Sequence, residues 1–234
     1  MDSHMPPQVS QWSKPRKTPV QRRSRVTVDA IFEATIQVLL AEGLARLTTT
    51  RVSERAGVSV GTMYQYFPNK QALIIALNER YLNTLAERVE GTCSLMAGQP
   101  ASKMVSALIE TYWTTKTERA DLTQALYRSV AALDNSELIQ AFATRVDAAT
   151  TKMFRQASDL PPEHAAEINL TLTTVVYGAV RNTFERQLGM EQITALKASL
   201  TDMCCAWLIS FQHRIQMTAK DSLRQQVRRK RRAM

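Results

Sequence analysis

The chain has 234 residues, of which 44% are hydrophobic and 22% charged, with a formal net charge of +9. These proportions are ordinary for a globular protein with one large or two small domains, and the scarcity of alternating β-branched runs predicts an all-α fold. No apolar run reaches the roughly 18 residues of a membrane span, no signal peptide is recognisable, and Cys93, Cys204 and Cys205 form neither a disulfide framework nor a zinc-spaced cluster. We therefore expect a cytoplasmic protein without metal or cofactor.

The positive charge lies at the two ends of the chain. Between Val26 and Leu223 there are 18 basic and 20 acidic residues. Basic arms attract polyanions, nucleic acid first and anionic membranes second, although one such run can also be a solubilising tail. The basic residues of the ends are Lys14, Arg16, Lys17, Arg22, Arg23 and Arg25, then Arg224, Arg228, Arg229, Lys230, Arg231 and Arg232.

Residues 1–25 contain four prolines and no apolar period, so we expect a disordered basic arm whose first five residues, MDSHM, are a cloning remnant. A first helix is predicted from Thr27, with Gly43 as its C-cap. A domain of residues 26–90 would follow the arm.

Two short helices come next in the sequence. Thr48 or Thr49 caps a helix that ends at Ala56, Gly57 stops it, and Ser59 caps a third helix over Val60–Phe67. Pro68 then breaks the chain, and a long fourth helix is expected from about Lys70 to Glu90. Two short helices joined through a glycine predict a helix-turn-helix.

The third helix has an unusual outer face for a packing helix. Met63 and Phe67 are four residues apart and would face the core, which leaves Gly61, Thr62 and Gln65 outside and Tyr64 and Tyr66 at the margin. Glycine permits close approach of another surface, and hydroxyls suit phosphate oxygens. The alternative reading of Tyr64 is a core tyrosine.

The stretch LTTTRVSERAGVSVGTMYQYFPNK, preceded by a helix that ends LLAEG, resembles the DNA-binding domain of TetR-type transcriptional repressors over about residues 26–81. The resemblance implies a homodimer that binds a near-palindromic double-stranded DNA operator through paired recognition helices. It also implies release of the DNA by a small-molecule effector in a larger helical ligand-binding and dimerisation domain, here residues 91–217, followed by a basic tail of residues 218–234. The DNA contacts implied by the match, together with the basic Arg25, are Arg25, Thr49, Thr50, Ser59, Val60, Gly61, Thr62, Tyr64, Tyr66 and Lys70.

The larger region is expected to hold helices over about Ala101–Arg119, Leu122–Leu133, Ser136–Ser158, Pro162–Leu188 and Met190–Met217. Its aromatic and methionine side chains are candidates for a ligand pocket, or else form plain core. Arg181 would need a carboxylate such as Glu185 or Glu110, or an anionic ligand, if it were buried, and otherwise lies on the surface. The candidates are Met104, Tyr112, Trp113, Tyr127, Met153, Tyr177, Arg181 and Phe184.

The last two helices are predicted to form a four-helix dimer interface with a second copy, or otherwise to pack on their own domain. The interface candidates are Leu170, Thr174, Gly178, Leu196, Leu200, Met203, Trp207 and Phe211.

No catalytic constellation is recognisable, so we expect no enzyme. The first hypothesis is a ligand-responsive, dimeric transcriptional regulator, in particular a repressor. The alternatives are a small-molecule carrier with a vestigial helix-turn-helix, and basic tails that hold the protein weakly on a membrane surface.

Overall fold

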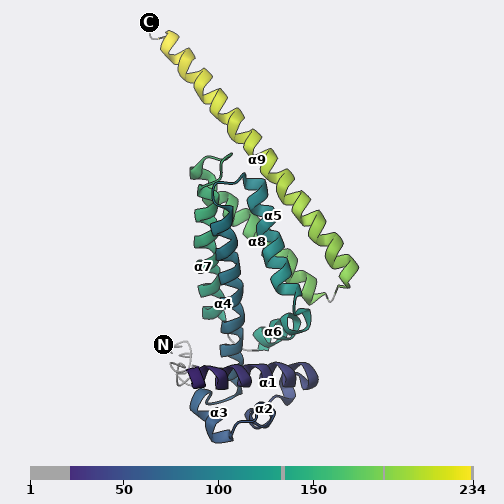
Figure 1. Ribbon diagram of the computed structural model, residues 1–234. Helices are drawn as coiled ribbons and strands as arrows, with labels where there is room; N and C mark the ends of the chain where they lie inside the picture. The colour runs from purple at the N-terminus through teal and green to yellow at the C-terminus, as the bar shows by residue number, and fades with distance from the viewer. Residues whose placement is uncertain (1–21, 133–134, 187, 233–234) are drawn as a thin grey trace, which may run out of the picture. The chain divides into compact units, whose positions relative to one another are not determined.

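The computed structural model describes residues 22–132, 135–186 and 188–232 (Figure 1), and these residues are helical apart from short connections, which confirms the all-α fold class. The chain divides into two compact units, the first formed by residues up to 86 with 116–143 and the second by 87–115 with 144–234. The helices that begin in the first half of the chain are α1 (Arg22–Arg46), α2 (Thr49–Ala56), α3 (Val60–Tyr66), α4 (Lys70–Met96) and α5 (Ala101–Thr117).

The later helices include one short 3₁₀ turn, η2, where the sequence predicts the start of an α-helix. Pro161 and Pro162 lack backbone N–H donors, and α-helix begins only after the turn. The helices are α6 (Ala120–Ala132), α7 (Ser136–Arg155), η2 (Pro162–His164), α8 (Ala165–Glu185) and α9 (Met190–Arg232).

Three helix boundaries differ most from the predictions. α1 begins at Arg22 and not at Thr27, because no proline or glycine lies between Pro19 and Gly43 to interrupt the helix. Arg25 is therefore helical and not part of an irregular arm. α4 passes through Gly91 to Met96, since burial of Val89 and Cys93 on either side outweighs a helix-propensity cost of about 1 kcal/mol. α9 continues through residues 218–232, which the prediction assigned to a separate tail; no glycine or proline stops it.

The first unit is organised around one hydrophobic cluster. Ile31 of α1, Val52 of α2 and Met63 of α3 are completely buried within it, and the Phe32 and Phe67 rings lie 5.5 Å apart. Arg80 of α4 lies over the Phe32 ring, with its guanidinium carbon 5.2 Å from the ring centroid. This cluster fixes which sides of α2 and α3 face outward.

The same cluster contains Leu122 and Leu126 of α6, which are 5% and 3% exposed. α6 therefore belongs to the first unit, whereas the sequence prediction placed all of residues 91–217 in the second domain. The physical reason is that the apolar stripe of α6 is buried with α1, a pairing between residues about 90 positions apart.

The second unit is built from α5, α7, α8, α9 and the C-terminal part of α4, around completely buried side chains that include Met104, Ile109 and Ile168. α9 is its longest helix, and in Figure 1 it passes beside α5 and α8 and then extends beyond them toward its C-terminal end. Among the described residues no helix combines the length and the hydrophobicity needed to cross a bilayer.

Candidate DNA-binding surface and effector cavity

The turn between α2 and α3 is set by caps. The Thr48 hydroxyl accepts a hydrogen bond from the Arg51 amide (3.2 Å) at the start of α2, and Gly57 ends the helix with a φ of 66°, a value that favours glycine. Ser59 then caps α3 by accepting a hydrogen bond from the Thr62 amide at 3.0 Å. These contacts are the predicted ones, and they form within a few residues of chain.

α3 presents two different faces. Met63 is completely buried and Phe67, just after the helix, is 2% exposed, as the four-residue spacing predicted. Val60 and Tyr64 are 41% and 44% exposed, so Tyr64 is not a core tyrosine. Ser59, Gly61 and Gln65 are exposed, and Thr62 and Tyr66 are half-buried.

Gly61 is not required by packing within the chain. A Cβ atom built at this position would lie 3.7 Å from the Ser59 Oγ atom, an ordinary van der Waals contact, and the residue does not have a positive φ. The absence of a side chain is instead consistent with close approach of an external surface.

The threonines at the start of α2 differ from each other. Thr49 is only 8% exposed, and its hydroxyl donates a hydrogen bond of 3.4 Å to the Tyr64 hydroxyl. Thr50 is exposed. Arg25 on α1 is also exposed, and Lys70 is half-buried at the start of α4.

The predicted DNA contacts do not include Gln65. It is exposed on the same outer side of α3 as Gly61, and its amide can both donate to and accept from a base edge. The helical period that placed Met63 inward was sufficient to place Gln65 outward.

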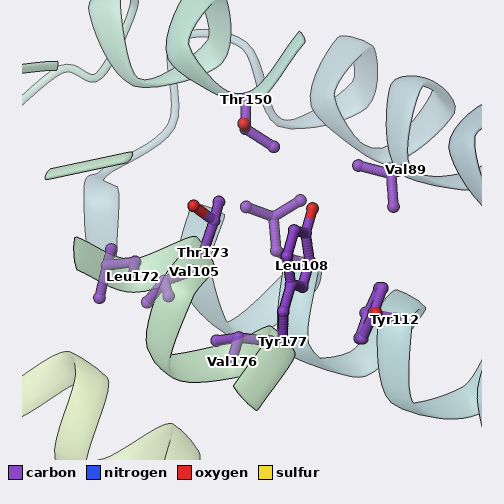
Figure 2. A pocket seen from close by; sticks show the side chains of 9 residues that line it. All are labelled: Val89, Val105, Leu108, Tyr112, Thr150, Leu172, Thr173, Val176 and Tyr177. Carbon is purple, nitrogen blue, oxygen red and sulfur yellow. The ribbon is translucent and has the colours of Figure 1, made fainter. Parts of the chain in front are cut away.

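A small cavity in the second unit lies between α4, α5, α7 and α8 (Figure 2) and has a volume of about 20 Å³, room for about one water molecule. Of the predicted ligand contacts, Tyr112 and Tyr177 line it, with ring centroids 4.7 Å apart. Burial, with a smaller effect of Asp147, raises the pKa of Tyr177. The lining residues are Val89, Val105, Leu108, Tyr112, Thr150, Leu172, Thr173, Val176 and Tyr177.

The other predicted ligand residues do not line this cavity. Met104, Trp113 and Phe184 are buried core residues, and Met153 borders an open groove between α4 and α7. Tyr127 belongs to the first unit, where its ring lies 4.8 Å from the Lys116 ammonium. Arg181 is exposed and its Nε lies 2.6 Å from a Glu185 carboxylate oxygen, so the surface reading of this arginine is the correct one.

The predicted dimer face is partly exposed. Leu170, Thr174 and Gly178 form an exposed stripe on α8, with Leu170 68% exposed, and Met203 on α9 is 54% exposed. Leu196 and Trp207 are half-buried.

Two members of the predicted face are buried in their own chain. Leu200 and Phe211 are 3% and 4% exposed, and Phe211 packs against the rings of Trp207 and His164 at 5.1 and 5.6 Å. The alternative of packing on their own domain therefore holds for these two residues, because they lie on the inner side of α9.

Residues 31–77 match the family model of bacterial regulatory proteins of the tetR family. The chain carries a TetR-family DNA-binding domain. The match covers α2 and α3 completely, together with most of α1 and the start of α4.

The similarity to individual proteins is of two kinds. The nucleoid occlusion factor SlmA of Haemophilus ducreyi is 30% identical over 125 residues, which are 53% of this chain and 58% of that protein. A regulator of Bacillus subtilis, YerO, is 23% identical over 129 residues, 55% of this chain and 44% of that protein. The chain thus spans less than two thirds of the curated relatives' length.

Solved structures show the same fold over most of the chain. A TetR family transcription regulator from Marinobacter aquaeolei VT8 superposes with a TM-score of 0.55 at 16% identity, over 77% of this chain and 96% of that one. The fatty acid degradation regulator FadR from Bacillus halodurans gives a TM-score of 0.59 at 16% identity, over 76% and 97%. At such identity the likeness concerns the fold alone, and no effector follows from it.

Proposed function

We propose that the protein is a ligand-responsive transcriptional repressor that binds a near-palindromic DNA operator as a homodimer and releases it when a small molecule binds the second unit. The observation that carries the proposal is the outer face of α3. Gly61 there is not needed for packing, Tyr64 is 44% exposed, and polar side chains surround both. A face of this kind suits insertion into a major groove.

Each neighbouring residue has a role in this proposal. Gly61 allows the backbone of α3 to approach the bases, and Val60 offers apolar contact to thymine methyl groups. Thr50, Tyr64, Tyr66 and Lys70 supply hydroxyl and ammonium groups for phosphate oxygens. Ser59 and Thr62, whose hydroxyl oxygens are 2.8 Å apart, lie at the leading end of the helix with Gln65 further along.

Dimer formation is supported by the exposed stripe on α8. Leu170 exposes 68% of its surface, and Met203 and Ile209 on α9 expose 54% and 58%. Apolar side chains that are exposed together on neighbouring helices are typical of a surface covered by a partner. A twofold pair of α8–α9 units would bury them in a four-helix arrangement.

An effector response is supported by the cavity together with the continuity of α4. Val89 of α4 lines the cavity, and the same helix begins at Lys70, directly after α3 and the Pro68–Asn69 turn. A ligand larger than one water molecule has to displace lining residues, of which Val89 is one.

The three cysteines are free thiols, consistent with a reducing cytoplasm.

The test is an electrophoretic shift with DNA from upstream of the protein's own gene. Wild-type protein is expected to retard this DNA, and Tyr64→Ala and Thr62→Ala are expected to abolish the shift while eluting as dimers on size exclusion. Absence of any shift by wild-type protein at low salt would favour the small-molecule carrier.

A second candidate is a role in nucleoid occlusion, which the name of the Haemophilus ducreyi relative suggests. Both candidates require DNA binding and differ in where it is used. A chromosome-wide map of bound sites separates them: we expect one or a few occupied promoters for a repressor, and many occupied sites for a protein that acts on the nucleoid as a whole.

A further inference from the structure

The polar groups around the cavity restrict the chemistry of its ligand. Five of the nine lining side chains are aliphatic, two are tyrosines and two are threonines, so none of the nine carries a charge at neutral pH. An ionised ligand buried there would have no lining countercharge, and burial of an unpaired charge is costly.

The hydroxyl groups of the two threonines are not available to a ligand as hydrogen-bond donors. The Thr150 hydroxyl donates a hydrogen bond to the Val146 carbonyl oxygen at 2.8 Å, and the Thr173 hydroxyl donates to the Asn169 carbonyl oxygen at 2.7 Å. Because each proton is used within its own helix, neither hydroxyl is available to donate to a ligand.

Asn169 does not line the cavity itself, but it lies on the same face of α8 as the lining residues Leu172 and Thr173. It lies one turn before Thr173 on α8 and is 4% exposed. Its Nδ2 donates to the Asp147 carboxylate at 3.2 Å, which fixes the amide orientation because a carboxylate only accepts. Its Oδ1 is buried without a hydrogen-bond partner, an arrangement that costs about 1–3 kcal/mol until a donor is supplied.

The charge near the cavity also disfavours an anionic ligand. After burial, the largest contribution that raises the pKa of Tyr177 comes from the negative charge of Asp147. A carboxylate ligand would meet the same unfavourable field, whereas a neutral donor would not. Figure 2 shows the Tyr177 hydroxyl turned toward the side of the cavity formed by Thr150 and Val89.

We propose that the effector is an uncharged, largely apolar molecule with one hydrogen-bond donor, such as a long-chain alcohol or a phenol, whose donor bonds to the Asn169 Oδ1 atom while its apolar part occupies an enlarged cavity. This proposal rests on the proposed effector response. It excludes ionised carboxylates, among them free fatty acids at neutral pH.

Three probes of equal chain length test the proposal on the full-length protein: 1-decanol, its methyl ether and decanoate at pH 8. Binding is measured by isothermal titration calorimetry without DNA, below the solubility limit of each probe. We expect 1-decanol to bind at least tenfold more tightly than either of the others, because the ether lacks a donor and decanoate is charged. Equal affinities, tighter binding of decanoate, or no binding of 1-decanol would overturn the proposal.

Two variants assign the effect to the amide. Asn169→Leu is expected to reduce the preference for 1-decanol over its ether to less than threefold, whereas Asn182→Leu, an exposed asparagine on the same helix, is expected to keep it. A preference that survives Asn169→Leu contradicts the role of Oδ1.

A pH series on wild-type protein provides a readout if Asn169→Leu does not fold. The apparent affinity for decanoic acid should rise more than tenfold between pH 8 and pH 5.5, because the carboxyl group, with a pKa of about 4–5 in water, is bound in its neutral form. The affinity for 1-decanol should stay constant. A pH-independent affinity for decanoate would overturn the proposal. Failure of the wild-type protein to bind operator DNA when no probe is present would instead refute the proposed function.

Discussion

Gly61 is the residue whose identity is hardest to explain from the fold and easiest to explain from DNA binding. An added Cβ meets only ordinary contacts within the chain. We therefore expect Gly61→Ala to preserve or slightly raise the melting temperature, since alanine favours a helix by about 1 kcal/mol over glycine, and to lower operator affinity at least tenfold by holding the helix away from the bases.

The matched control is Gly91→Ala in α4. Gly91 is also a helical glycine, and an added Cβ there would have no atom within 4 Å. It is expected to give a similar thermal shift in differential scanning fluorimetry with unchanged operator affinity in fluorescence anisotropy. Equal DNA affinity of the two variants would show that Gly61 is not at the DNA surface.

Lys116 is the other residue with an unusual environment. It is 3% exposed, its ammonium lies 4.6 and 4.8 Å from the ring centroids of Tyr81 and Tyr127, and burial lowers its pKa from 10.5 to about 7. Below pH 7 the charged amine is buried at full cost, which the two rings offset in part. Between pH 7 and 10.5 the unfolded chain binds more protons than the folded chain, so this group makes stability rise with pH.

The corresponding prediction concerns Lys116→Met. Its free energy of unfolding should exceed that of the wild type by more at pH 7 than at pH 9.5, and this advantage should shrink by about 3 kcal/mol between the two pH values. Urea denaturation at both pH values measures it, with the exposed Lys103→Met as control. A pH-independent difference would mean that Lys116 keeps an ordinary pKa.

At the scale of the element, α2 and α3 have only eight and seven residues and depend on their caps and on tertiary burial. The cap of α2 is Thr48, whose hydroxyl accepts from the Arg51 amide. We expect Thr48→Ala to lower the free energy of unfolding by about 1 kcal/mol and Thr48→Ser to retain most of it. If both variants lose the same amount in urea denaturation, the cap hydrogen bond is not what stabilises α2.

At the scale of the whole molecule, the proposed repressor requires two copies. Leu170 is 68% exposed on the α8 stripe, and Leu95 is 79% exposed on α4 of the same unit. Leu170→Arg is expected to convert the dimer to a monomer in analytical ultracentrifugation and to weaken operator binding at least a hundredfold, because only one half-site is then held. Leu95→Arg should do neither, and a dimeric Leu170→Arg would place the interface elsewhere.

The helix-turn-helix could be predicted from the sequence almost residue by residue. Thr48, Gly57 and Ser59 act through hydrogen bonds and backbone preferences that span only a few residues, and Met63 and Phe67 follow the helical period. Such signals do not depend on the rest of the chain, so the order of the elements and the outer face of α3 were determined locally.

Only the tertiary structure decided which distant helices pack together. It buried α6 with α1, turned Leu200 and Phe211 inward, left Arg181 on the surface, and brought Tyr112 and Tyr177 to one cavity from residues 65 positions apart. An amphipathic period reveals that a helix has an inner side but not what covers it, because that contact energy belongs to pairs of residues far apart in the chain.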